Sequence, residues 1–114
     1  HPMCPLITPD GLYAFIVPSP KRGDLHRDGR FAMHSFPLDD NEDAFYLTGV
    51  AHPVGDHSLR ARLERQFADE RSAAGVPAAG EDQELFEFGV QSAMLTITTG
   101  HGDPSPQHTI WHAP

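Results

Sequence analysis

The sequence predicts a mainly β fold, a small antiparallel barrel of six or seven strands covered by one principal amphipathic helix. Short apolar runs rich in aromatic and β-branched residues recur along the chain, and turn signals separate them. Only one long stretch has the periodicity of an amphipathic helix. With 114 residues, among them 11 prolines and 10 glycines, residues 1–114 are expected to form a single domain with many turns.

The first two predicted strands form a hairpin. They span residues 2–8 and 12–17, and both are dominated by apolar side chains. Between them, Pro9-Asp10-Gly11 is a strong turn signal because proline fixes φ and the next two residues are frequent in tight turns.

The third and fourth predicted strands span residues 31–36 and 44–52, with an acidic loop between them. The fourth strand alternates between its two faces. One face carries Phe45, Leu47, Gly49 and Ala51, and the other carries Tyr46, Thr48, Val50 and His52.

The one long helix is predicted to begin after Asp56, which is a good N-cap residue, and to end near Ala73. Leu59, Leu63 and Phe67 are spaced four residues apart, so they form an apolar stripe that packs on a sheet. A linker over 75–82 follows, and three further strands are predicted over 85–90, 93–98 and 109–113.

The charge pattern argues against binding to nucleic acid, and the hydropathy pattern offers no membrane-spanning segment. The formal net charge is −8, and four of the eight Lys and Arg residues lie between Lys21 and Arg30. A nucleic-acid backbone requires an extended basic face, which this clustering does not provide. No apolar run is long enough to span a bilayer, and no signal peptide is recognisable.

The composition favours a cytoplasmic homodimer. The hydrophobic fraction of 39% is low for a compact monomer, and a second copy would complete the core. Trp111 is expected to contribute to that dimer core rather than to stack on a ligand. Cys4 is the only cysteine, which excludes an internal disulfide and favours a reducing compartment. Because the chain begins at His1 without an initiator methionine, we expect part of the first strand to be missing.

The junction after the second strand predicts an anion site. Ser19 is a good N-cap, and Pro20 suits the first helical position because its missing N–H costs nothing there. Lys21 and Arg22 then fall in the first turn, where the helix dipole disfavours cations. An anion bound at this helix end, such as the phosphate of a nucleotide-like cofactor, would explain their position.

The alternative is a solvated turn in which these cations pair with Asp24 and Asp28, since such surface pairs are common and weak. The short helix is expected to span residues 21–27 and to stop at Gly29 in a left-handed conformation.

Several short motifs follow one another in a defined order. They are Ser-x-Lys at Ser19–Lys21, Asp28-Gly29-Arg30 before the third strand, Phe-Tyr-Leu-Thr-Gly over 45–49, and Thr-Ile-Trp-His-Ala over 109–113. In this order and spacing, mainly over residues 12–54, the chain resembles the pyridoxamine 5'-phosphate oxidase-like family of flavin-binding split β-barrels, particularly its actinobacterial members.

The resemblance implies a split β-barrel that binds FMN as a homodimer. In that family the Ser-x-Lys pair lies at the cofactor phosphate, so Ser19 and Lys21 are the implied phosphate ligands. Phe15 and Ile16, at the end of the preceding strand, would lie beside the cofactor.

Two further residues are candidates for the cofactor site. Arg22 is a candidate for an additional phosphate contact. His34, at the end of the third strand, is a candidate for facing the cofactor, and its alternative is a polar residue satisfied at a strand end. The histidines of the C-terminal region match no standard zinc spacing, so no metal site is predicted.

The implied activity is hydride transfer between FMN and an unidentified small-molecule substrate. The alternatives are a reductase that uses a deazaflavin as cosubstrate, and a non-catalytic flavin- or haem-binding module. Ala44 stands where the true oxidases often carry glutamine, and their C-terminal Arg-x-His is absent. Pyridoxamine-phosphate oxidase activity itself is therefore not expected, and no catalytic residue is identified.

Overall fold

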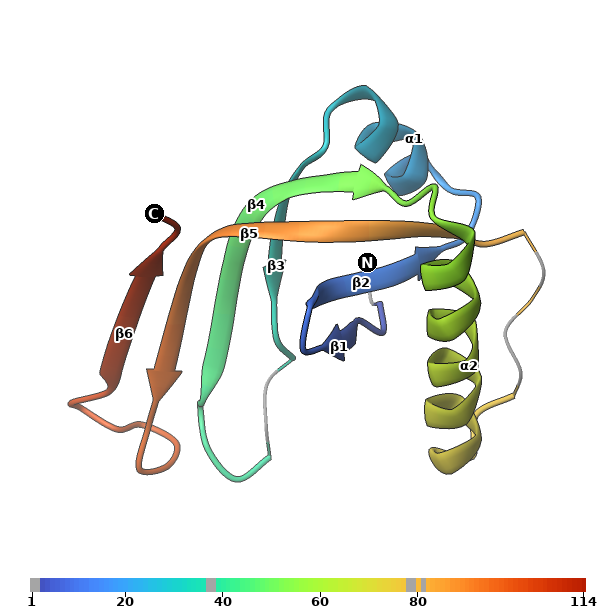
Figure 1. Ribbon diagram of the computed structural model, residues 1–114. Coiled ribbons are helices and arrows are strands. Elements are labelled where there is room, and N and C mark those ends of the chain that lie inside the picture. Colours follow the sequence, from blue (N-terminus) through green and yellow to red (C-terminus); the bar gives the residue numbers. More distant parts are fainter. Residues whose placement is uncertain (1–2, 37–38, 78–79, 81) are drawn as a thin grey trace. The chain divides into compact units, whose positions relative to one another are not determined.

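The computed structural model describes residues 3–36, 39–77, 80 and 82–114. Within them the elements follow the order β1 (Leu6–Thr8), β2 (Gly11–Ile16), α1 (Pro20–Arg27), β3 (Arg30–His34), β4 (Ala44–Pro53), α2 (His57–Ala73), β5 (Glu84–Ile97) and β6 (Gln107–His112) (Figure 1). The strands form one sheet in the order β1-β2-β5-β4-β3, and β6 pairs with β5. The predicted mainly β fold is confirmed.

The chain divides into two compact units. The first contains the residues up to Gly29 together with Ala51–Gly89, and the second contains Arg30–Val50 and Val90–Pro114. Strands β4 and β5 each run from one unit into the other. Neither helix in the described part of the chain is long and apolar enough to cross a membrane.

The hairpin predicted at the start of the first unit is present. Strands β1 and β2 pair antiparallel, with Thr8 opposite Gly11. The turn between them is closed by the Thr8 hydroxyl oxygen, which accepts hydrogen bonds of 3.1 Å from the backbone N–H groups of Asp10 and Gly11. Such local side-chain contacts are one reason why threonine favours turns.

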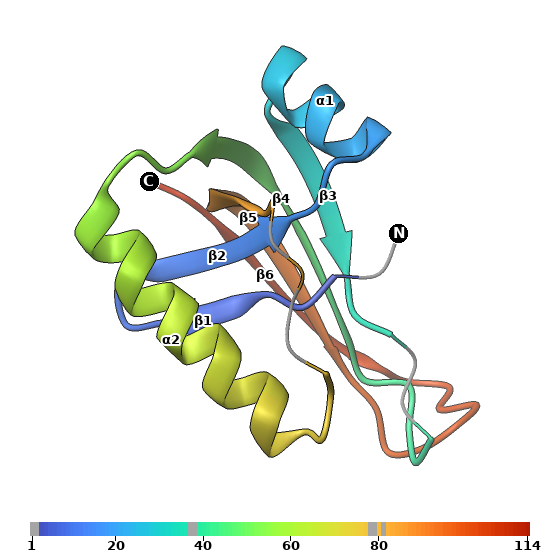
Figure 2. The same ribbon diagram turned by 90° about the vertical axis from the view of Figure 1, so that its right-hand side faces the viewer.

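Helix α2 covers this hairpin as the apolar stripe predicts (Figure 2). Its N-cap is Asp56, whose carboxylate accepts from the N–H groups of Ser58 and Leu59 at 2.9 and 3.1 Å. Leu63 is completely buried on the inner face of the helix. It belongs to a core cluster with Leu6, Tyr13 and Leu85, and the partly buried side chains packed against this cluster are Phe15, Val54, Leu59 and Phe67.

In the second unit, β3 pairs with the first half of β4, and β6 pairs with the second half of β5. The prediction of two separate strands over 85–90 and 93–98 is wrong, because β5 is one continuous strand of 14 residues. Gln91 and Ser92 are polar, but neither breaks a strand, and the ladder to β6 already includes Ser92 opposite His112.

The predicted left-handed stop at Gly29 is also wrong. Helix α1 ends at Arg27, and its C-cap residue, Asp28, has extended backbone angles of φ −150° and ψ 105°. A left-handed glycine instead follows α2, where Gly75 has φ 69° and donates to the carbonyl of Ser72 at 3.1 Å.

Tyr13 gives a testable pH dependence. Its ring is buried, with 4% of its surface exposed, and burial raises the phenol pKa above its usual 10.0, with smaller contributions from the carboxylates of Glu87 and Asp10. The unfolded phenol therefore loses its proton first as the pH rises, so the free energy of unfolding should fall above about pH 10. Urea denaturation at several pH values measures this slope.

The Tyr13→Phe variant should lose part of that slope. The control is Tyr46→Phe, since Tyr46 is the other tyrosine and is 44% exposed. An unchanged slope in Tyr13→Phe would contradict the assignment.

Candidate functional site

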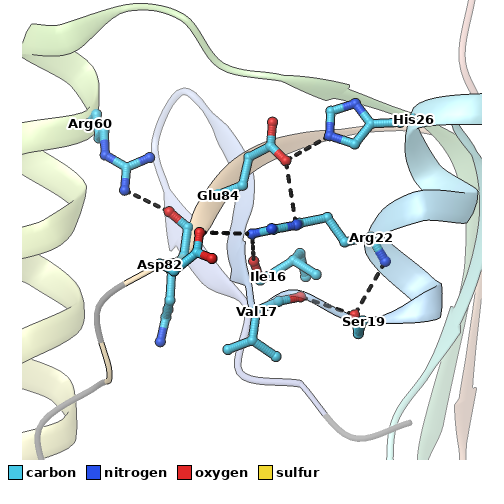
Figure 3. Close-up of polar contacts among 9 residues, drawn as sticks. Ile16, Val17, Ser19, Arg22, His26, Arg60, Asp82 and Glu84 are labelled. Carbon is cyan, nitrogen blue, oxygen red and sulfur yellow. Dashed lines mark hydrogen bonds and ion pairs between the residues drawn. The ribbon is translucent and has the colours of Figure 1, made fainter.

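The first turn of α1 is built as the sequence predicts. Ser19 is the N-cap, with φ −169° and ψ 162°, and Pro20 occupies the first helical position. The Ser19 hydroxyl oxygen accepts from the N–H of Arg22 at 3.3 Å and donates its own hydrogen to the carbonyl of Val17 at 2.9 Å (Figure 3). The Ser19 hydroxyl thus connects the end of β2 to the start of α1.

These contacts decide which donors an incoming anion could use. Pro20 has no N–H, and the N–H groups of Arg22 and Gly23 already donate to Ser19. The Ser19 hydroxyl would have to break its hydrogen bond to the Val17 carbonyl before it could donate to an anion. Within the described residues, this leaves the N–H of Lys21 as the free backbone donor of the first turn.

Lys21 is half-buried, and its burial lowers the pKa of the ammonium group below the usual 10.5. No carboxylate in the described part of the chain pairs with it. A partly buried charge without a partner costs free energy, because the surrounding protein displaces some of the water that would hydrate it. An anion bound beside Lys21 would offset this cost and raise its pKa again.

Arg22 is engaged elsewhere. Its guanidinium donates to the carbonyl of Ile16 and to the carboxylate of Asp82, both at 3.4 Å, and lies 3.8 Å from the Glu84 carboxylate (Figure 3). The same Glu84 oxygen lies 2.6 Å from Nε2 of His26. The arrangement therefore gives no support to Arg22 as a phosphate contact.

Of the ion pairs that the sequence offers as the alternative, the pair of Arg27 with Asp24 is present. Arg22 has other partners than the expected Asp24 and Asp28. Asp82 and Glu84, which pair with Arg22, lie about 60 residues further along the chain, at and before the start of β5. Sequence proximity alone could not identify these two partners.

Ile16 and Phe15 lie at the end of β2, but they face different surroundings. Ile16 is buried, with 2% of its surface exposed, and contributes its carbonyl to Arg22. The ring of Phe15 stacks on Phe67 of α2 with centroids 5.3 Å apart, and the guanidinium of Arg60 lies 5.4 Å from its centre.

Phe15 and Phe67 line a groove of about 740 Å³ in the first unit. Helix α2 lines it along most of its length, from Arg60 to Ser72, and Asp82 and Gln83, just before β5, also line it. Sequence reasoning missed this groove, although Phe67 and Arg71 stand four residues apart on the same face of a helix. The groove is of the size that accommodates small organic ligands.

His34 belongs to the second unit. It ends β3, opposite Tyr46, and its side chain is exposed. Its Nδ1 lies 3.1 Å from the carbonyl oxygen of Ser35. This contact gives His34 a polar partner at the strand end. It agrees with the alternative to a cofactor contact that the sequence analysis gives.

No protein-family model matches the sequence, and a search of curated proteins likewise finds no match.

Proposed function

We propose that this protein binds FMN, with the cofactor phosphate at Lys21, and that it is an oxidoreductase for a small molecule. The observation that carries the proposal is Lys21, a half-buried cation with a pKa lowered by burial and no carboxylate partner among the described residues. It stands at the N-terminal turn of α1, where an anion is favoured. The Ser-x-Lys resemblance in the sequence supports the same position.

In this proposal the phosphate accepts hydrogen bonds from the Lys21 ammonium group and from the free backbone N–H of Lys21. The Ser19 hydroxyl exchanges its hydrogen bond to the Val17 carbonyl for one to the phosphate. Phe15 and Ile16 lie at the adjoining end of β2, beside the cofactor. Arg22 and His34 are left out, because both side chains already have partners within the protein.

Bound FMN supplies reversible hydride transfer. The residues of this chain would bind the phosphate and orient the ring, and no acid–base residue is assigned. Two alternatives use the same site: a deazaflavin reductase, in which the flavin analogue is a dissociable cosubstrate, and a flavin- or haem-binding module without turnover.

The test is titration of FMN into the wild type and Lys21→Ala, followed by flavin absorbance and fluorescence. We expect the affinity to fall at least tenfold, or about 1.4 kcal/mol, because a charge-assisted phosphate contact is lost. Arg27→Ala is the matched control, since it removes one positive charge from the same helix at a side chain that is 73% exposed. Equal loss in both variants would indicate a general charge effect and contradict the site.

If the wild-type protein does not bind FMN but binds a deazaflavin, the deazaflavin reductase is favoured. If FMN binds and a nicotinamide cannot reduce it, the non-catalytic alternative is favoured. FMN binding that is unchanged in Lys21→Ala would place the phosphate elsewhere.

We further propose a cytoplasmic homodimer. The only cysteine, Cys4, is free and exposed, as suits a reducing compartment. Large apolar side chains are exposed on the strands of the second unit, and three of them share one face of the β5–β6 pair: Leu95, Ile97 and Trp111. Exposed large apolar side chains on one face of a strand pair are typical of an interface.

A further inference from the structure

The groove that α2, Phe15 and the residues before β5 line has an apolar aromatic wall. Phe15 and Phe67 stack with an interplanar angle of 23°, and the guanidinium of Arg71 lies 5.3 Å from the centre of the Phe67 ring. Val76, also in the lining, is 43% exposed. A flat apolar group that entered the groove would cover these surfaces and remove them from water.

Among the described residues, the charged side chains that line the groove are two arginines and two carboxylates: Arg60, Arg71, Glu64 and Asp82. Each carboxylate is paired with an arginine. Glu64 pairs with Arg60 at 2.9 Å, and Asp82 pairs at 3.4 Å with Arg22, which lies outside the lining. Arg71 remains as the lining charge that no carboxylate in the described residues neutralises.

Arg71 is also held in place. Its Nε–H donates to the carbonyl of Pro77 at 2.8 Å, so one of its five N–H donors is used within the protein. The guanidinium is further restrained against the Phe67 ring. The two terminal nitrogens are left for a partner, and their fork matches the two oxygens of a carboxylate.

We propose that this groove is a binding site for a planar aromatic carboxylate, with the ring on Phe15 and Phe67 and the carboxylate on Arg71. The charge complementarity to Arg71 selects an anion over a neutral aromatic compound. The site shares Phe15 with the proposed cofactor site, but it uses no contact of Lys21, so Lys21 variants distinguish the two proposals.

Isothermal titration calorimetry with 2-naphthoate tests the site. We expect 2-naphthoate to bind the wild type and to bind Arg71→Gln about tenfold more weakly, because a bidentate charge-assisted contact is lost. The neutral analogue 2-naphthamide should bind both proteins equally and more weakly. Arg65→Gln is the matched control, since Arg65 is an exposed arginine of the same helix that does not line the groove.

A second variant tests the apolar wall. Ala68 is exposed and lines the groove, so Ala68→Trp should fill it and abolish binding without disturbing the core. Lys21→Ala should leave naphthoate binding unchanged, which separates this site from the proposed phosphate site. Equal affinities for naphthoate and naphthamide, or unchanged binding in Arg71→Gln, would overturn the proposal. So would naphthoate binding that disappears as the protein concentration rises, because a second copy would then occupy the groove.

Discussion

Replacing Leu63 by alanine is expected to lower the free energy of unfolding by about 3 kcal/mol. Leu63 is completely buried, and it packs in one cluster with Leu6, Tyr13 and Leu85 from three strands. Truncation removes apolar contacts between α2 and the sheet and leaves a cavity that a helix packed on a sheet fills only partly. For a domain of this size, such a loss is a large part of the total stability.

Urea denaturation followed by circular dichroism measures this change. The matched control is Ile7→Ala, which removes a side chain of the same size from the same unit. Ile7 is 76% exposed, so its truncation should cost less than about 1 kcal/mol. Similar losses in the two variants would mean that Leu63 is not at the centre of the core.

The sequence predicts the parts of the fold that depend on local patterns. The spacing of Leu59, Leu63 and Phe67 predicts the inner face of α2, and all three pack as expected. Asp56 predicts the start of α2 because a capping carboxylate acts on residues two and three positions away. Residues that act on their immediate neighbours can be recognised without knowledge of the tertiary structure.

The errors concern features that distant residues decide. Strand β5 continues through Gln91 and Ser92 because the ladder to β6 extends there, and the local composition contains no information about that partner. Gly29 was expected to end α1 in a left-handed turn, yet Asp28 leaves the helix in an extended conformation before β3 begins. Tertiary pairing overrides a weak local preference in both cases.

In the candidate site, too, local contacts could be predicted and contacts with distant residues could not. The cap at Ser19 could be predicted, because it involves only the next few residues. The partners of Arg22 could not, because Asp82 and Glu84 reach α1 through the pairing of β2 with β5. The contrast between a paired Arg22 and a half-buried Lys21 without a carboxylate partner among the described residues emerges only from the structure.

The proposed homodimer makes a second prediction of large effect. Successive residues of a strand alternate between faces, and residues directly opposite each other share one. Trp111 lies opposite Ala93, and Leu95 and Ile97 continue the same face of β5. These three large side chains are 44–48% exposed in the single chain. Buried aromatic side chains are frequent hot spots of interfaces, so Trp111 is the residue whose replacement should weaken the dimer most.

Trp111→Glu should raise the dimer dissociation constant about 100-fold or more, because it removes the ring and places an unpaired charge on the apolar face. Sedimentation velocity over a range of protein concentrations measures the change. The control is His112→Glu, which introduces the same negative charge one residue away on the opposite face of β6. A monomeric wild type would refute the dimer itself. A dimer that tolerates Trp111→Glu as well as His112→Glu would show that the two copies meet through another surface, because a charge cannot be buried in an apolar contact without this cost.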